Sequence, residues 1–124
     1  MTDPLALVLY DKLMPGSALV NRLQDLKYRV QTINSPAVLL KTAQEAKPLV
    51  VLADIESNSA SVCDAIAKLK ATKATSHLPV IGFGHDPGAG LQDQARKAGA
   101  NVIANEAAIL GHLPQLLDQA LQIE

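Results

Sequence analysis

The most constraining feature of this sequence is the run at residues 49–54 (LVVLAD), in which five apolar residues are followed directly by Asp54. A short apolar run without alternation is typical of a strand buried on both faces, as in a parallel sheet covered by helices. In such sheets the ligand crevice lies beyond the carboxyl ends of the central strands. Asp54 is therefore a candidate functional residue, although a carboxylate at this place can equally cap the following turn.

Four further segments are expected to be strands. Residues 5–10 (LALVLY) form a second apolar run that is followed by an acid. Residues 29–34 (RVQTIN) are the most polar of the set, which suits a strand at the edge of a sheet. Residues 79–84 (PVIGFG) begin with a proline, which is tolerated at a strand start. Residues 101–105 (NVIAN) form a short last strand.

Apolar residues recur at helical spacing between these strands. The first helix is expected to begin near Ser17, after a Pro-Gly pair that suits a loop or a first turn. The second is expected to begin at Ser35, whose hydroxyl can cap it, and to be ended by Pro48. Gly99 is the expected C-cap of the fourth helix. The repeats that define the five helices are Leu19, Leu23, Leu26; Leu39, Ala43, Ala46; Val62, Ile66, Leu69; Leu91, Ala95, Ala98; and Leu113, Leu116, Leu117, Ala120, Leu121.

Strand and helix alternate five times within 124 residues, a length that suits one domain. Alternation of this kind requires parallel strands joined by right-handed crossovers. The sequence therefore predicts a single domain over residues 1–124 with a doubly wound α/β fold, a (βα)5 arrangement of five parallel strands in the order 2-1-3-4-5.

The composition excludes several function classes. The formal net charge is −1, from 11 basic and 12 acidic residues, and duplex binding usually needs a basic stripe. We therefore expect no direct contact with nucleic acid. The single Cys63 cannot form an internal disulfide, and it is expected to be a small core residue in a reduced, cytoplasmic setting. No stretch approaches the roughly 20 apolar residues of a membrane span, and the N-terminus lacks the basic start of a signal peptide.

Other chemistry-bearing side chains are sparse. The histidines show no metal-ligand spacing, and His85 is the one expected at the same edge of the sheet as Asp54. Neither a Ser-His-Asp arrangement nor a Walker-type phosphate loop is recognisable. The remaining basic cluster is expected to be a solvated helix face, formed by Lys68, Lys70 and Lys73.

A second acid, Asp11, follows the first predicted strand. The first and third strands are neighbours in the order 2-1-3-4-5, so the carboxylates of Asp11 and Asp54 should converge at one edge of the sheet. Two carboxylates and a backbone carbonyl suit a hard octahedral cation such as Mg²⁺. With a metal to neutralise charge, one carboxylate can act as a nucleophile towards a phosphoryl group.

From about residue 5 to residue 121 the chain resembles the receiver domains of bacterial two-component response regulators, which have a flavodoxin-like fold. The pieces that carry the resemblance are LALVLYD, LKYRV, KPLVVLADI, LPVIGFG and KAGANVI, in the family's order and at its spacing. The resemblance implies a signalling domain of a phosphorelay rather than an enzyme. It also implies that Asp54 is the phosphoacceptor and that Asp11, Asp54 and the backbone carbonyl of Glu56 bind Mg²⁺.

The same resemblance implies protein partners, namely a histidine kinase or an output protein. The family's usual partner face consists of the fourth helix, the fifth strand and the fifth helix, and a homodimer through this face is plausible. No contact with a membrane is implied.

The chain departs from the family at the positions that respond to phosphorylation. Gly84 replaces a threonine or serine, Ile103 replaces the switch aromatic residue, and Glu106 replaces a lysine. The family's hydroxyl and lysine hold the phosphoryl oxygens, so their loss should weaken any coupling. Tyr10 replaces the first of the two metal-binding acids, and Mg²⁺ is expected to bind weakly or not at all.

Two interpretations of Asp54 therefore stay open. Asp54 accepts a phosphoryl group and signals through an altered switch, or it is retained in a pseudo-receiver that binds its partner whatever its phosphorylation state. The departures favour the second interpretation. A function from another class is a small flavodoxin-like ligand-binding domain or enzyme at the same edge. A flavin is disfavoured because the chain has one Phe, two Tyr and no Trp to stack on the ring, and Tyr10 alone is expected at that edge.

Overall fold

A parallel sheet of five strands forms the centre of the computed structural model, which describes residues 5–10, 13–56, 59–84 and 88–122. The strand order β2-β1-β3-β4-β5 confirms the order predicted from the sequence. All strand pairs are parallel. The strands are β1 (Leu5–Leu9), β2 (Arg29–Ile33), β3 (Val50–Asp54), β4 (Val80–Phe83) and β5 (Val102–Ala104).

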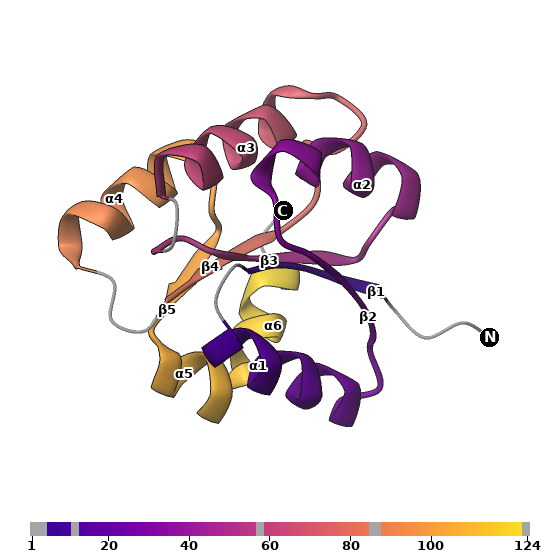
Figure 1. The fold of residues 1–124 in the computed structure, drawn as a ribbon, viewed down its shortest axis with the longest axis vertical. Helices are drawn as coiled ribbons and strands as arrows, with labels where there is room; N and C mark the ends of the chain where they lie inside the picture. The colour runs from indigo at the N-terminus through magenta and orange to yellow at the C-terminus, as the bar shows by residue number, and fades with distance from the viewer. Residues whose placement is uncertain (1–4, 11–12, 57–58, 85–87, 123–124) are drawn as a thin grey trace.

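Helices cover both faces of this sheet (Figure 1). One layer, above the sheet in the figure, holds α2 (Leu39–Ala46), α3 (Ser59–Ala71) and α4 (Ala89–Ala98). The other layer holds α1 (Leu13–Asp25), α5 (Glu106–Gly111) and α6 (Leu113–Gln122). This is the doubly wound α/β arrangement expected from the alternation of strands and helices.

The central strand β3 explains why the sequence run at residues 49–54 is apolar without alternation. All five residues of β3 are buried, because a helical layer lies on each side of the strand. Val51 and Ala53 belong to the core under α2, α3 and α4, whereas Val50 and Leu52 belong to the core over α1, α5 and α6. By contrast, β2 lies at the sheet edge and its residues are exposed or half-buried, as its polar sequence predicted.

The boundaries of two helices differ from the predictions. Helix α1 begins at Leu13 rather than near Ser17. The Pro-Gly pair falls in its first turn, where a proline costs no intrahelical hydrogen bond. The segment after Ser35 begins as a 3-10 turn, η1 (Pro36–Val38), and α2 follows it. Within the part of the chain that the structure describes, the Ser35 side chain makes no capping hydrogen bond, so its predicted capping role is wrong.

The chain after β5 forms two helices where one was predicted. Asn105, expected as the last strand residue, is the N-cap of α5, and its side chain accepts a hydrogen bond of 2.9 Å from the N–H of Ala108. A helix as short as α5 shows no helical repeat of apolar residues, so sequence periodicity does not reveal it. The predicted C-cap at Gly99 is confirmed, with a φ of 127°.

Lys70, one of the three lysines expected on a solvated helix face, makes hydrogen bonds within the protein instead. The Lys70 ammonium group donates to the carbonyl oxygen of Leu78 at 2.6 Å and to Oδ1 of Asn101 at 3.1 Å. Oδ1 of Asn101 also accepts the N–H of Val80 at 2.9 Å. Lys70 therefore connects the end of α3 to the starts of β4 and β5. This contact lies at the amino ends of the strands, whereas Asp54 lies at the carboxyl end of β3.

Candidate functional site

Asp54 is the last residue of β3 and lies at the carboxyl-end edge of the sheet. Its Oδ1 accepts a hydrogen bond of 2.9 Å from the backbone N–H of Glu56, so the carboxylate caps the turn that follows the strand. The residue is only 4% exposed. Asp54 thus makes the capping contact that the sequence left open as an alternative. Its role as a phosphoacceptor stays a prediction.

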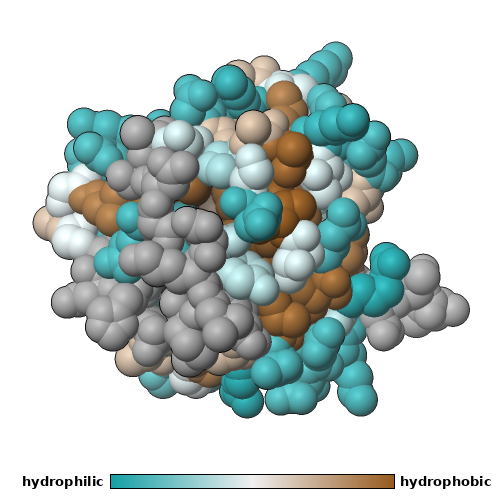
Figure 2. All heavy atoms as spheres, viewed as in Figure 1, coloured by the Kyte–Doolittle hydropathy of each residue, from teal (hydrophilic) through white to brown (hydrophobic). Residues whose placement is uncertain are grey.

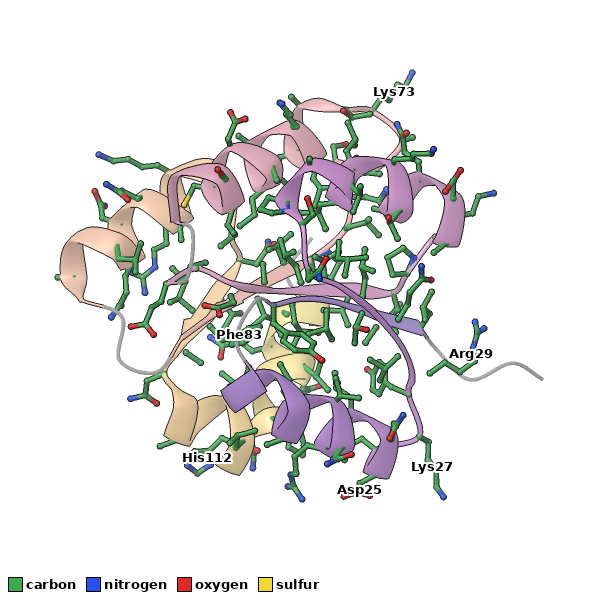
Figure 3. The ribbon with its side chains drawn as sticks, viewed as in Figure 1. Asp25, Lys27, Arg29, Lys73, Phe83 and His112 are labelled. Carbon is green, nitrogen blue, oxygen red and sulfur yellow. The ribbon has the colours of Figure 1, made fainter. Side chains whose placement is uncertain are left out.

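The neighbours of Asp54 across the sheet follow from the strand register. Asp54 pairs with Phe83 on β4, and Phe83 pairs with Ala104 on β5. Phe83 is fully buried and points from the sheet towards the layer of α1, α5 and α6 (Figure 3). Leu9 pairs with Ala53, so Tyr10 and Asp54, which follow them, lie at neighbouring strand ends. Across the sheet, Asp54 therefore lies beside the buried aromatic residue Phe83 and next to the strand end of Tyr10.

Tyr10 occupies the strand-end position where an acid was expected from the resemblance. Its N–H donates to the carbonyl oxygen of Ile33 at 3.0 Å, and its half-buried side chain packs on the core over α1, α5 and α6. Tyr10 also lines a cavity of about 440 Å³ with Thr32, Ile33, Asn34 and Val38. Figure 2 shows hydrophobic residues at the surface between α2 and α1, in the region where Figure 1 shows β2. Tyr10 is the one aromatic residue among the described residues of this lining.

The space beside Gly84 is occupied by the side chain of Glu56. A Cβ atom placed on Gly84 would lie 2.6 Å from Cγ, 2.7 Å from Cδ and 2.7 Å from Oε1 of Glu56. Real Cβ atoms do not approach other heavy atoms so closely, so any side chain at position 84 would have to displace Glu56. The family resemblance had assigned a metal-binding role to the backbone carbonyl of Glu56 and no role to its side chain. The glycine at position 84 was the signal that a neighbouring side chain could fill this space.

The other two switch positions, Ile103 and Glu106, lie in β5 and at the start of α5. Ile103 is half-buried and packs on the core under α2, α3 and α4. Glu106 is the first residue of α5, directly after the N-cap Asn105. Gly84 directly follows β4 and Ile103 lies in the middle of β5, whereas the roles of these two positions and the effect of the Glu106 charge stay predictions.

The described residues fit a magnesium ion poorly. Asp54 supplies one carboxylate, of which one oxygen already accepts the Glu56 N–H. Among the residues that the structure describes, no three His, Cys, Asp or Glu side chains lie close enough together to hold a metal ion. Asp11, the predicted second carboxylate, lies outside the described residues. Mg²⁺ demands near-octahedral oxygen coordination, so the function proposed below contains no step that depends on a metal.

The remaining candidate residues of the sequence do not join this site. His85 lies outside the described residues. His77 and His112 are exposed, and Figure 3 shows His112 on the outer side of the α5 and α6 layer. Cys63 is half-buried against the core under α2, α3 and α4, and burial raises the pKa of its thiol. A raised pKa lowers the thiolate fraction, which agrees with a core residue rather than a nucleophile.

Neither a protein-family model nor a curated protein sequence matches the chain. No helix within the described ranges has the length and apolar character needed to cross a membrane.

Solved structures, however, are similar over nearly the whole chain. A putative response regulator from Chloroflexus aurantiacus has a TM-score of 0.88 at 16% identity, covering 97% of this chain and 98% of that chain. The receiver domain of a sensor histidine kinase from Pseudomonas aeruginosa, solved with magnesium in its active-site cleft, has a TM-score of 0.85 at 17% identity, with coverages of 97% and 98%. A chemotaxis protein from Vibrio cholerae has a TM-score of 0.84 at 17% identity, with coverages of 97% and 100%. The chain therefore has the flavodoxin-like fold of response-regulator receiver domains.

Proposed function

We propose that this chain is a receiver-like signalling domain, a pseudo-receiver, that binds a protein partner whatever the phosphorylation state of Asp54. The observation that carries the proposal is the state of the switch positions beside Asp54. Position 84 has no side chain, and Glu56 fills the space that one would need. Ile103 is an apolar side chain packed on the core. Neither residue offers a polar group that could follow a phosphoryl oxygen and move the surface.

Asp54 has a structural reason to be retained in such a domain. Its carboxylate caps the turn after β3 through the Glu56 N–H, and it does so from a nearly buried position. A buried polar group that satisfies a backbone donor stabilises the local turn without any phosphoryl chemistry. An asparagine at position 54 would keep an oxygen acceptor for the same N–H. Asp54→Asn should therefore leave the fold and partner binding intact.

The proposed partner is a histidine kinase or an output protein in the cytoplasm. The proposed contact surface is formed by α4, β5 and α6, which correspond to the fourth helix, fifth strand and fifth helix expected from the sequence. A homodimer through this surface belongs to the same proposal. We expect no direct contact with nucleic acid or a membrane, no enzymatic activity, and weak Mg²⁺ binding at most.

Intact mass after incubation with Mg²⁺ and acetyl phosphate tests the proposal. An ordinary receiver domain, treated in parallel, shows that the donor is active. The wild-type chain should keep its mass, and its amide spectrum recorded by NMR should not change. A phosphate-sized gain in mass that is lost in Asp54→Asn, together with a change in the amide spectrum, would return the chain to the phosphorelay and contradict the proposal.

The rival function, a small flavodoxin-like ligand-binding domain or enzyme, has one supporting observation. The cavity lined by Tyr10, Thr32, Ile33, Asn34 and Val38 has a volume within the range of ligand pockets. A flavin needs stacking partners, and the described residues of this lining offer one aromatic ring. An absorbance spectrum of the purified protein with bands of a bound flavin would favour the rival.

A further inference from the structure

The side chain of Glu56 spans the gap between the ends of β3 and β4. Its backbone N–H is tied to Asp54 Oδ1 at 2.9 Å, which fixes the base of the side chain beside the carboxylate. Its Cγ, Cδ and Oε1 lie 2.6 to 2.7 Å from the place of a Cβ on Gly84. Gly84 follows Phe83, the residue with which Asp54 is paired on β4. The side chain therefore crosses from one strand end to the next directly beside Asp54.

We propose that the Glu56 side chain, by occupying the space at Gly84, is the residue that excludes a phosphoryl group from Asp54. This inference rests on the proposed function and names the residue responsible for it. Acyl phosphate formation requires an Asp54 oxygen to attack the phosphorus of a donor such as acetyl phosphate, while the bond to the leaving acetate breaks. The transferred group then needs room for three oxygens beside the strand end, and the Glu56 side chain fills the space at the neighbouring strand end, beside Gly84.

Two physical effects act in the same direction. Asp54 is 4% exposed, so its carboxylate offers little surface to a donor. A carboxylate beside that approach also repels a phosphoryl donor, whereas receiver-like chemistry needs cationic or hydrogen-bonding groups around the developing charge. Occupancy is the decisive effect, because the long Glu56 side chain fills the space beside Gly84, where the family has only a small hydroxyl residue that binds the phosphoryl oxygens.

Four variants separate occupancy from charge. Glu56→Ala removes the side chain, and Glu56→Gln keeps its volume but removes its charge. The double variant Glu56→Ala with Gly84→Thr also adds a hydroxyl at position 84. Glu45→Ala is the matched control, because Glu45 is an exposed glutamate on α2. Each protein is incubated with Mg²⁺ and acetyl phosphate, and its intact mass is measured with and without Asp54→Asn.

The expected result is a phosphate-sized gain for Glu56→Ala, a larger phosphorylated fraction for the double variant, and no gain for Glu56→Gln, Glu45→Ala or the wild type. Every gain should disappear with Asp54→Asn. A gain in Glu56→Gln as large as that in Glu56→Ala would overturn the role of occupancy. Absence of any gain in both variants that lack the Glu56 side chain would overturn the inference and leave the proposed function standing. A gain in the wild type would overturn the inference directly, and a change in the amide spectrum with that gain would overturn the proposed function as well.

Thermal unfolding of the same set gives a second readout that does not depend on phosphoryl chemistry. Gly84→Thr alone should lower the unfolding midpoint modestly, because the flexible end of the Glu56 side chain has to move out of the space that the threonine takes. The same change in the Glu56→Ala background should cost less. Equal costs in the two backgrounds would show that Glu56 does not occupy the space at position 84 in solution, and would contradict the inference.

Discussion

The ammonium group of Lys70 lies 3.1 Å from Oδ1 of Asn101 and holds the end of α3 against the start of β5. The same group donates to the Leu78 carbonyl oxygen at 2.6 Å. Replacing Lys70 with methionine keeps much of the apolar stem but removes both hydrogen bonds. Because hydrogen bonds from charged donors are stronger than neutral ones, Lys70→Met should lower the free energy of unfolding by about 1 to 2 kcal/mol in urea denaturation.

Lys73→Met is the matched control for this variant. Lys73 is exposed and extends away from the body of the protein (Figure 3), so its loss should change the unfolding free energy by less than about 0.5 kcal/mol. Equal midpoints for the two variants would show that the Lys70 contacts contribute nothing to stability.

The pH dependence of stability should carry the signature of Lys70. Burial lowers the pKa of Lys70 from its ordinary value of 10.5, so the folded protein binds this proton less tightly than the unfolded chain does. Linkage then makes the free energy of unfolding rise as the pH climbs through the folded pKa towards 10.5. The difference in unfolding free energy between the wild type and Lys70→Met should therefore widen over this range. Urea titrations at a series of alkaline pH values measure it, and a constant or shrinking difference would contradict the assignment.

Two glycines of the α4 region should respond to alanine in opposite directions. Gly99 has a φ of 127°, and a Cβ there would collide with the stem of Lys70, so Gly99→Ala should destabilise by more than about 1 kcal/mol. Gly90 lies inside α4 with no described atom within 4 Å of a Cβ, so Gly90→Ala should stabilise by about 0.5 to 1 kcal/mol. Thermal denaturation measures both, and a stable Gly99→Ala protein would refute the positive-φ constraint.

The short helix α5 should depend on its cap. Asn105→Ala removes the acceptor for the Ala108 N–H and should cost about 0.5 to 2 kcal/mol in the unfolding free energy. Asn105→Asp keeps a side-chain oxygen acceptor and should retain most of that stability. Denaturation midpoints compare the three proteins; an aspartate variant as weak as the alanine variant would argue against capping.

The sequence was sufficient for the sheet, because its strands carry a strong local signal. Residues 49–54 are uninterruptedly apolar, and both faces of β3 are buried. The strand β2 was assigned to an edge because its residues are the most polar of the set, and its position was confirmed. Gly99 was recognised as a cap because few other residues adopt its backbone conformation.

The parts that sequence reasoning missed depend on contacts between distant residues or on weak local preferences. Lys70 was taken for a solvated charge, since only the fold brings Leu78 and Asn101 to its ammonium group. Helix α1 begins earlier than predicted, because proline and glycine are neutral in a first turn. The Glu56 side chain was overlooked because its contact at Gly84 comes from a neighbouring strand.

The contact between Glu56 and Gly84 also couples the two positions in evolution. A mutation of Gly84 to a residue with a side chain meets the end of the Glu56 side chain, whereas a shortening of Glu56 leaves a glycine that tolerates the change. A side chain gained at position 84 therefore requires Glu56 to move or to shorten. The two positions should vary together among descendants of this chain, and a homologue with a long side chain at both would need another side-chain conformation at position 56.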